Sequence, residues 1–216
     1  MRRPPSGFTL LELLILLCIL ALVVAVFGCQ TAAFGSQSEA FVLADSANLR
    51  WHRERLEFYR LKNKVGLPTA GGHKFVLSTW SVADHTVDSF DRYFTPGRRD
   101  NDPHYRKKRE LIERGEDPWS DLKATTSLDT HYAGRALEHL QSAMSGEDEA
   151  LMADDNEGVW SHADGTVNVM SGWAVRTYSF LDLKELGFVQ GDFDKDRPIE
   201  TTGPNSPIPE CRKLAR

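Results

Sequence analysis

The chain has few cysteines and lacks the sequence patterns that mark the common enzyme classes. Its three cysteines, Cys18, Cys29 and Cys211, are too few for a disulfide framework, although a single bridge between Cys29 and Cys211 stays open. There is no H-E-x-x-H metal motif, no glycine-rich phosphate loop and no G-x-S-x-G nucleophile elbow. These absences predict a protein that is not an enzyme and that needs no cofactor.

A basic surface is missing as well. The chain holds 26 lysines and arginines against 31 aspartates and glutamates, and its formal net charge is −5. Proteins that bind nucleic acid usually present a positive surface. The most basic stretch, residues 98–117, interleaves acids with its cations and has no ladder of aromatic residues on which bases could stack. The sequence therefore argues against nucleic acid as a partner.

One long apolar run is present, and it lies near the N-terminus. The run from Phe8 to Phe27 holds about twenty residues, which as a helix measure about 30 Å, the thickness of a bilayer core. Arg2 and Arg3 precede it and would keep the N-terminus in the cytoplasm. Glu12 lies inside the run, where a carboxylate costs a few kcal/mol. The pattern predicts a single spanning helix whose acid requires a partner.

Two other interpretations of this segment were weighed against the spanning helix. A cleaved signal peptide usually has an apolar region of about 7–15 residues, and no small-x-small cleavage pattern follows this longer run. The stretch Val26–Cys29 resembles a lipoprotein box, in which Cys29 would carry lipid, although Phe27 is bulky for that position. The alternative function is therefore an exported, membrane-anchored or lipidated domain that binds a ligand and does not polymerise.

The stretch Gly7-Phe8-Thr9-Leu10-Leu11-Glu12 resembles the processing site of type IV prepilins and type II secretion pseudopilins. The shared features are a short basic leader that ends in glycine, a phenylalanine after it, and a glutamate as fifth residue of the mature chain. The resemblance implies that prepilin peptidase removes residues 1–7, cuts between Gly7 and Phe8, and methylates the new amine of Phe8. Residues 8–28 would then form the transmembrane and assembly helix.

The same resemblance gives Glu12 a role in filament assembly. Subunits of such filaments pack their N-terminal helices together with little water between them, so the Glu12 carboxylate of one subunit can pair with the Phe8 ammonium of its neighbour. A buried ion pair adds little net stability when it forms, but removing one partner is strongly destabilising. Such a pair is therefore best suited to fixing the register between neighbouring subunits. We expect pairing between the Phe8 ammonium and the Glu12 carboxylate to select neighbouring subunits that lie one axial step apart in the filament.

The rest of the chain predicts an α+β fold of pilin-like plan, in which one long helix packs on a small antiparallel sheet. Within residues 29–65 the apolar residues Val42, Leu49 and Leu56 recur every seven positions among charged residues, as expected for an amphipathic continuation of the anchor. Residues 66–197 would form the globular domain. The proline-rich residues 198–216 are expected to be extended and mobile.

Local patterns predict further elements in the globular part. Apolar and β-branched runs with turn residues between them indicate strands and a hairpin, and a glycine that follows an apolar run indicates the end of a helix. The expected elements are a strand at 149–154, hairpin strands at 166–170 and 174–180, a helix at 181–186 that stops at Gly187, a short strand at 93–96, and either a buried helix or a strand at 74–82.

The C-terminal third resembles the end of the pseudopilin-like proteins of planctomycetes, which carry a histidine, nine residues and then Asp-Gly. Here nine residues after His162 lead to Ser171, so that Gly172 and Trp173 stand in the Asp-Gly places. The histidine and the strand around Asn168 match the pattern, whereas the Asp-Gly pair does not. The resemblance implies a divergent member of that group.

Two acidic stretches are candidates for calcium. Asp192, Asp194 and Asp196 stand at alternate positions, as at the start of a calcium loop, but the glycine and the closing glutamate of such a loop are missing. Asp154 and Asp155 begin a second oxygen-rich stretch. Acidic loops without metal are commoner than calcium sites, and zinc is a weaker candidate than calcium.

Taken together, the sequence predicts a minor pseudopilin or pilin-like structural subunit. Its expected partners are prepilin peptidase, other pseudopilins or pilins and the inner-membrane assembly platform. It would be a single-pass inner-membrane protein with a short cytoplasmic N-terminus and a periplasmic or otherwise extracytoplasmic domain.

Overall fold

The computed structural model describes residues 10–64, 66–140, 149–156, 158–172 and 174–216, and in the first helix it describes the side chains of Ile15, Ile19 and the residues from Ser38 onward. The chain divides into two compact units, Met1–Glu39 and Ala40–Arg216. The expected processing residues Gly7 and Phe8 and the side chain of Glu12 lie outside the described part. Over that part, no helix is both long and apolar enough to cross a membrane.

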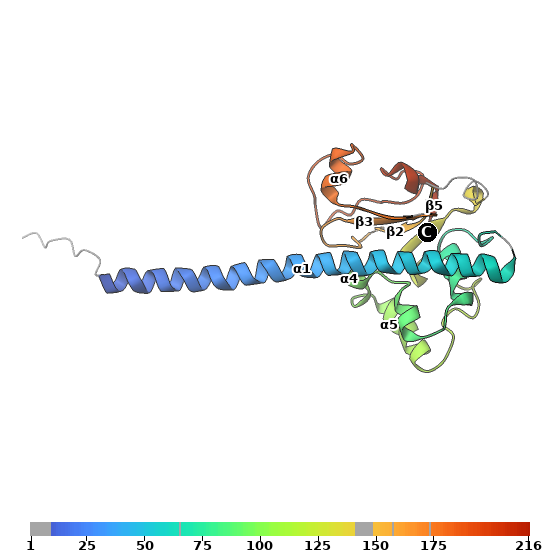
Figure 1. Ribbon diagram of the computed structural model, residues 1–216, viewed down its shortest axis with the longest axis horizontal. Helices are drawn as coiled ribbons and strands as arrows, with labels where there is room; N and C mark the ends of the chain where they lie inside the picture. Colours follow the sequence, from blue (N-terminus) through green and yellow to red (C-terminus); the bar gives the residue numbers. More distant parts are fainter. Residues whose placement is uncertain (1–9, 65, 141–148, 157, 173) are drawn as a thin grey trace, which may run out of the picture. The chain divides into compact units, whose positions relative to one another are not determined.

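The second unit contains the sheet, and its architecture confirms the α+β class. Five antiparallel strands lie in the order β4-β3-β2-β1-β5. Figure 1 labels β3, β2 and β5 of this sheet. In the strand register, Tyr132 of β1 lies opposite Asp154 of β2, and Asn168 of β3 lies opposite Thr177 of β4. The strands are β1 (Tyr132–Arg135), β2 (Ala150–Asp154), β3 (Val167–Ser171), β4 (Val175–Tyr178) and β5 (Leu214–Ala215).

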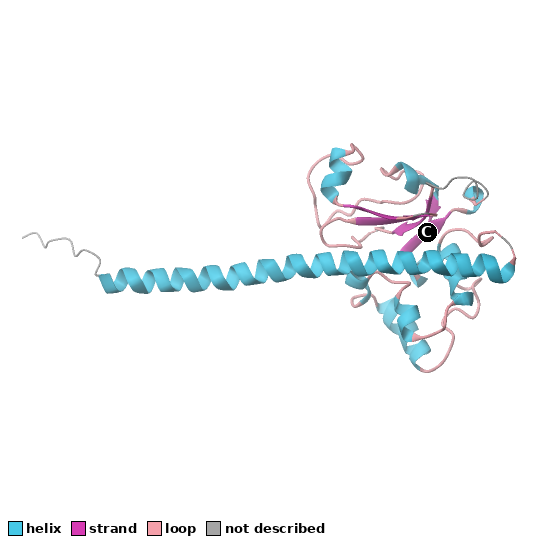
Figure 2. Cartoon of the chain, viewed as in Figure 1, coloured by secondary structure: helices cyan, strands magenta, loops and turns pink. Residues whose placement is uncertain are grey.

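Helices account for most of the remaining regular structure (Figure 2). The first, α1, runs from Leu10 to Asn63 and includes the expected amphipathic segment, which ends as predicted before the turn residues at 66–68. The others are short: α2 (His73–Leu77), α3 (Val87–Asp91), α4 (Pro96–Arg99), α5 (Pro103–Glu113), α6 (Phe180–Glu185), and the 3-10 turns η1 (Ser78–Val82), η2 (Ser127–Asp129), η3 (Leu137–His139) and η5 (Pro209–Lys213).

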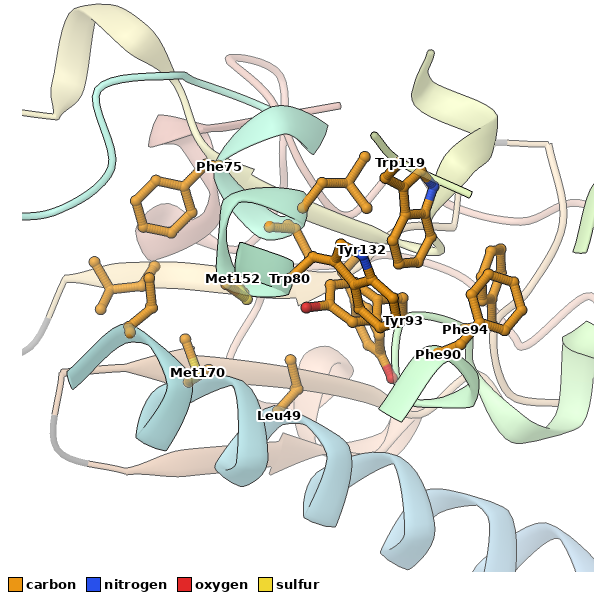
Figure 3. Close-up of a cluster of buried hydrophobic side chains, with 14 of the residues drawn as sticks. Leu49, Phe75, Trp80, Phe90, Tyr93, Phe94, Trp119, Tyr132, Met152 and Met170 are labelled. Carbon is orange, nitrogen blue, oxygen red and sulfur yellow. The ribbon is translucent and has the colours of Figure 1, made fainter. Parts of the chain in front are cut away.

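The apolar stripe of α1 packs in the core as the heptad spacing predicts. Leu49 is fully buried and Leu56 is 2% exposed, and both belong to the larger of two hydrophobic clusters. Figure 3 shows Leu49 gathered with Met152 and Met170 of the sheet and with a group of aromatic rings. The rings include Trp80, Phe90, Tyr93, Phe94, Trp119 and Tyr132. Because α1 contributes only a narrow stripe to this core, burial at these few positions determines how it packs in the Ala40–Arg216 unit.

The residues after Pro198 differ from the expected extended, mobile tail. Alternate strand residues such as Val167 and Val169 belong to a second hydrophobic cluster, and the tail adds Ile208, Cys211 and Leu214 to it, each at most 1% exposed. Leu214 also begins β5, which pairs with β1. Burial of the apolar residues at positions 208, 211 and 214 offsets the entropy cost of ordering this segment, so the segment packs on the sheet domain despite its prolines.

Cys211 is a free thiol in this cluster. Its burial raises the pKa of the thiol well above the ordinary value, with Glu210 and Asp154 adding to the effect. The structure thus gives Cys211 a packing role, and the side chain of Cys29 lies outside the described part.

The packing of the tail predicts a measurable loss of stability when Leu214 is truncated. Leu214→Ala is expected to lower the free energy of unfolding by about 2–5 kcal/mol, since a buried leucine is replaced by a cavity. Leu181→Ala is the matched control, because Leu181 is 62% exposed and its truncation is expected to change stability by less than about 0.5 kcal/mol. Denaturant unfolding of the two variants makes the comparison, and equal effects would mean that the tail is not part of the core.

Most of the helices and strands predicted for the globular part are confirmed, and one predicted strand is wrong. The strand at 149–154, the 166–180 hairpin and the helix that stops at Gly187 are confirmed, and Gly187 has the left-handed φ of 72° that favours glycine there. Residues 74–82 are helical rather than extended. The short strand expected at 93–96 is wrong, because Thr95 caps helix α4 and Pro96 occupies its first turn.

Candidate functional site

The most unusual feature of the described residues is a buried cluster of two carboxylates and one imidazole, which we call the Asp-Asp-His cluster: Asp45, Asp154 and His162. Asp45 comes from α1, Asp154 is the last residue of β2, and His162 lies in the loop before β3. Both aspartates are 0% exposed and His162 is 2% exposed. Asp154 and His162 are close together in sequence, whereas Asp45 lies 117 positions before His162, so that a helix and a distant strand–loop segment meet at ionisable side chains within the core.

One ring nitrogen of His162 faces both carboxylates. His162 Nε2 lies 3.2 Å from Asp45 Oδ2 and 3.2 Å from Asp154 Oδ2. Among the described residues, Asp45, Asp154 and His162 form the only group of at least three acidic, histidine or cysteine side chains that could hold a metal ion. One ligand atom from each residue lies within 4.8 Å of the other two. The loop that carries His162 is fixed by Asn156, whose side-chain oxygen accepts a hydrogen bond of 2.8 Å from the Ser161 amide.

A second layer of hydrogen bonds orients the two carboxylates. The backbone amide of Asn168 donates to Asp154 Oδ2 at 2.8 Å, and the Asn168 side-chain amide donates to Asp45 Oδ2 at 2.8 Å. Tyr132 donates its hydroxyl to Asp45 Oδ1. Thr177 in turn donates to Asn168 Oδ1 at 2.7 Å, which fixes the orientation of the amide. Strands β1, β3 and β4 thus all contribute to holding the cluster in place.

Burial and mutual contact shift the pKa values of the cluster in different directions. Burial, together with repulsion from Asp45, raises the pKa of Asp154 well above its ordinary value. Burial also acts to raise the pKa of Asp45, but hydrogen bonds from His162, Asp154 and Tyr132 outweigh it and leave that pKa below its usual value. Burial lowers the pKa of His162, yet its two carboxylate partners reverse this and raise it to about 10.

A second buried histidine lies two turns further along the same face of α1. His52 is 0% exposed, its Nε2 lies 2.9 Å from the Arg92 carbonyl oxygen, and its Nδ1 lies 3.3 Å from Thr79 Oγ1. Burial lowers the pKa of His52 from 6.5 to about 4, although the Arg92 carbonyl and Asp45 act to raise it. His52 is therefore neutral at pH 7.

This shift predicts a pH-dependent contribution of His52 to stability. Because its folded pKa lies below its ordinary value, the unfolded chain takes up the proton more readily, and the contribution is complete above pH 6.5 and lost as the pH falls to 4. The full loss is about 3 kcal/mol. We expect the difference in unfolding free energy between the wild type and His52→Gln to shrink by about this amount between pH 7 and pH 4. Urea unfolding at several pH values measures it, and a constant difference would contradict the prediction.

The structure separates the residues that the sequence proposed for calcium. Asp154 joins the Asp-Asp-His cluster, whereas Asp155 pairs with Arg216, whose Nε lies 2.8 Å from Asp155 Oδ2. Asp192 pairs at 2.8 Å with Lys184 at the surface. Asp194 and Asp196 are also exposed, and the three acids of that loop do not form one of the metal-binding groups found among the described residues.

Sequence reasoning missed Asp45 as a site residue, although a signal for it was present. In the heptad that begins at Val42, the apolar residues occupy one core position, and Asp45 and His52 occupy the other, three residues later. Polar residues at core positions of an amphipathic helix indicate a buried polar network. His162 was singled out through the histidine-x9 resemblance. Gly172 lies between β3 and β4, and Trp173 lies outside the described residues.

The cluster can hold protons or a cation, and it can tie elements together, but its burial closes it to a substrate. No protein-family model matches the chain, and no curated protein or solved structure shows significant similarity to it.

Proposed function

We propose that the protein is a structural subunit, a minor pseudopilin or pilin-like protein, of a type II secretion or type IV pilus-like filament. The observation that carries the proposal is the position of Glu12, the one acid of the apolar run, five residues after Gly7. An arbitrary apolar segment rarely places its single acid at that position. Prepilin peptidase would cut between Gly7 and Phe8, and the apolar helix would remain in the inner membrane until assembly.

The fold is compatible with this role. A helix of 54 residues, α1, begins at Leu10 within the processing motif, and its residues from Ala40 onward belong to the same unit as a small antiparallel sheet. In a filament, the N-terminal part of such a helix would pack against other subunits while the sheet domain stays at the surface. The chain would thus present its extracytoplasmic domain to cargo, to other pseudopilins or to the assembly platform.

The state of the ionisable groups also favours a structural role over catalysis. The most strongly perturbed acids and histidines, those of the Asp-Asp-His cluster, are sealed in the core. Perturbed groups in an open cleft would indicate an active site, whereas a sealed cluster whose members come from a helix, a strand and a loop joins those elements. The cluster would hold α1 to the sheet when a subunit is pulled or pushed during assembly.

Chemical cross-linking of native membranes tests the proposal. In cells that hold the complete secretion or pilus apparatus, we expect cross-links between this chain and other chains with the same N-terminal motif, and their loss when the prepilin peptidase is inactivated. A chain that forms no such cross-links and carries lipid on Cys29 would instead support the exported, non-polymerising domain.

A further inference from the structure

Hydrogen bonding alone leaves the geometry around His162 incompletely explained. A neutral or protonated imidazole carries at most one proton on Nε2, yet Asp45 Oδ2 and Asp154 Oδ2 both lie 3.2 Å from that atom. The amide nitrogen of Asn168, itself a donor, lies 3.3 Å from the same Nε2. Charge-assisted hydrogen bonds between nitrogen and carboxylate oxygen usually measure about 2.7–2.9 Å. The single Nε2 proton cannot be donated to both carboxylates at once, and both separations exceed the usual length of a charge-assisted hydrogen bond.

The same distances suit a metal ion placed between the three atoms. In a tetrahedral site with metal–ligand bonds of about 2.0–2.1 Å, neighbouring ligand atoms lie about 3.3 Å apart. His162 Nε2 and its two carboxylate oxygens are separated by 3.2 Å on each side, and one ligand atom from each residue lies within 4.8 Å of the others. The three side chains thus converge as the ligands of a single ion do.

An unpartnered oxygen supplies an independent indication. Asp154 Oδ1 is buried and has no hydrogen-bond partner, on a residue that is 0% exposed. Leaving a buried polar atom without a partner is costly, and such atoms need an explanation in water, an ion or function. An ion bound by the cluster would supply the interaction that Asp154 Oδ1 otherwise lacks.

The surrounding residues form the outer layer that metal sites require. Asp45 accepts hydrogen bonds from Asn168 and Tyr132, and Asp154 accepts one from the Asn168 backbone amide. Such contacts keep the ligands oriented and tune their affinity for the ion. These hydrogen bonds orient the two carboxylates, whereas His162 Nδ1 is buried and has no hydrogen-bond partner.

We propose that Asp45, Asp154 and His162 bind one divalent transition-metal ion that joins α1, β2 and the loop before β3. The imidazole nitrogen favours zinc over calcium or magnesium, which prefer sites made only of oxygen. Two carboxylates balance the charge of a divalent ion, and structural metal centres take all of their ligands from the protein. The ion would therefore stabilise the fold and take no part in a reaction.

Metal analysis of the wild-type full chain tests the proposal directly. The protein is extracted in detergent and purified without chelators, and its metal content is measured by elemental mass spectrometry. We expect about one equivalent of a transition metal per chain, in keeping with one ion for the three ligands. After removal of the metal, Zn²⁺ at a hundredfold excess over its Kd is expected to raise the melting temperature by about 5–10 °C, and Ca²⁺ is expected not to do so.

Matched substitutions show whether the ion is held by the cluster. Asp154→Asn and His162→Gln are expected to lose the response to Zn²⁺, whereas Asp194→Asn, which changes an exposed acid in the same way, is expected to keep it. A wild-type chain that contains no transition metal and gains less than about 1 °C from Zn²⁺, Co²⁺ and Mn²⁺ would overturn the proposal. An Asp154→Asn variant that responds as strongly as the wild type would overturn it too. The wild-type measurement decides even where a variant fails to fold.

Discussion

Replacing Asp45 with alanine is expected to lower the free energy of unfolding by about 3–5 kcal/mol, because it removes one member of a buried charged pair. Asp45 is 0% exposed and accepts hydrogen bonds from Tyr132 and Asn168 in addition to its contact with His162. Its loss leaves these three groups in the core without their shared acceptor. A typical small domain has only 5–15 kcal/mol of stability, so the variant is expected to be near the limit of folding.

Glu54→Ala is the matched control for Asp45→Ala, since Glu54 lies on the same helix and is exposed. Its effect is expected to be below about 0.5 kcal/mol. Denaturant unfolding of the full chain in detergent measures both variants. An effect of Asp45→Ala below about 1 kcal/mol would show that the cluster does not hold α1 in the fold.

Replacing Glu12 with glutamine is expected to abolish assembly while leaving the leader cleavable. The variant keeps the size of the side chain but removes the charge that is proposed to pair with the Phe8 ammonium of a neighbouring subunit. Breaking a buried ion pair costs about 3 kcal/mol or more, which corresponds to about a hundredfold loss of affinity between subunits. Cross-links between this chain and its neighbours in native membranes are expected to fall accordingly.

Glu39→Gln makes the same chemical change on an exposed residue of the same helix and is expected to change the cross-linking yield by less than about twofold. If Glu12→Gln and Glu39→Gln assemble equally well, the register role of Glu12 is wrong. Removal of the leader is followed in parallel, so that a defect in processing is not mistaken for a defect in assembly.

The sequence predicted those parts of the fold in which a repeating pattern and a local end signal agree. The heptad spacing predicted the packed face of α1, on which Leu49 and Leu56 are buried and Val42 is half-buried. Gly187 predicted the end of α6. The hairpin of β3 and β4 was predicted because β-branched runs flank a short turn. In each case, short-range pattern and tertiary packing favour the same structure.

The predictions failed where tertiary packing overrides local preference. Tyr93 and Phe94 have the residue types of a strand, yet they follow α3 and pack in an aromatic cluster before the cap at Thr95. Around Pro207 and Pro209, composition suggested a mobile tail, but Ile208 between them and Cys211 and Leu214 after them are buried. Composition describes the cost of ordering a segment and does not reveal which surface is available to bury it.

The Asp-Asp-His cluster was beyond sequence reasoning for a related reason. Asp45 and His162 are 117 positions apart, and Asp154 was interpreted with its neighbour Asp155 as one oxygen-rich loop. In the structure these two aspartates have different partners, since Asp154 contacts His162 and Asp155 contacts Arg216. Only the pairing of β2 with its neighbours fixes which of the two faces α1.

The intact mass of the protein extracted from native membranes tests the proposed function most directly. Processing as a pilin-like subunit predicts a chain that begins at Phe8, with a single methyl group on its amine and without residues 1–7. A chain that still begins at Met1, or one that begins at a diacylated Cys29, would contradict it, because neither leaves the Phe8 amine with which Glu12 is proposed to pair.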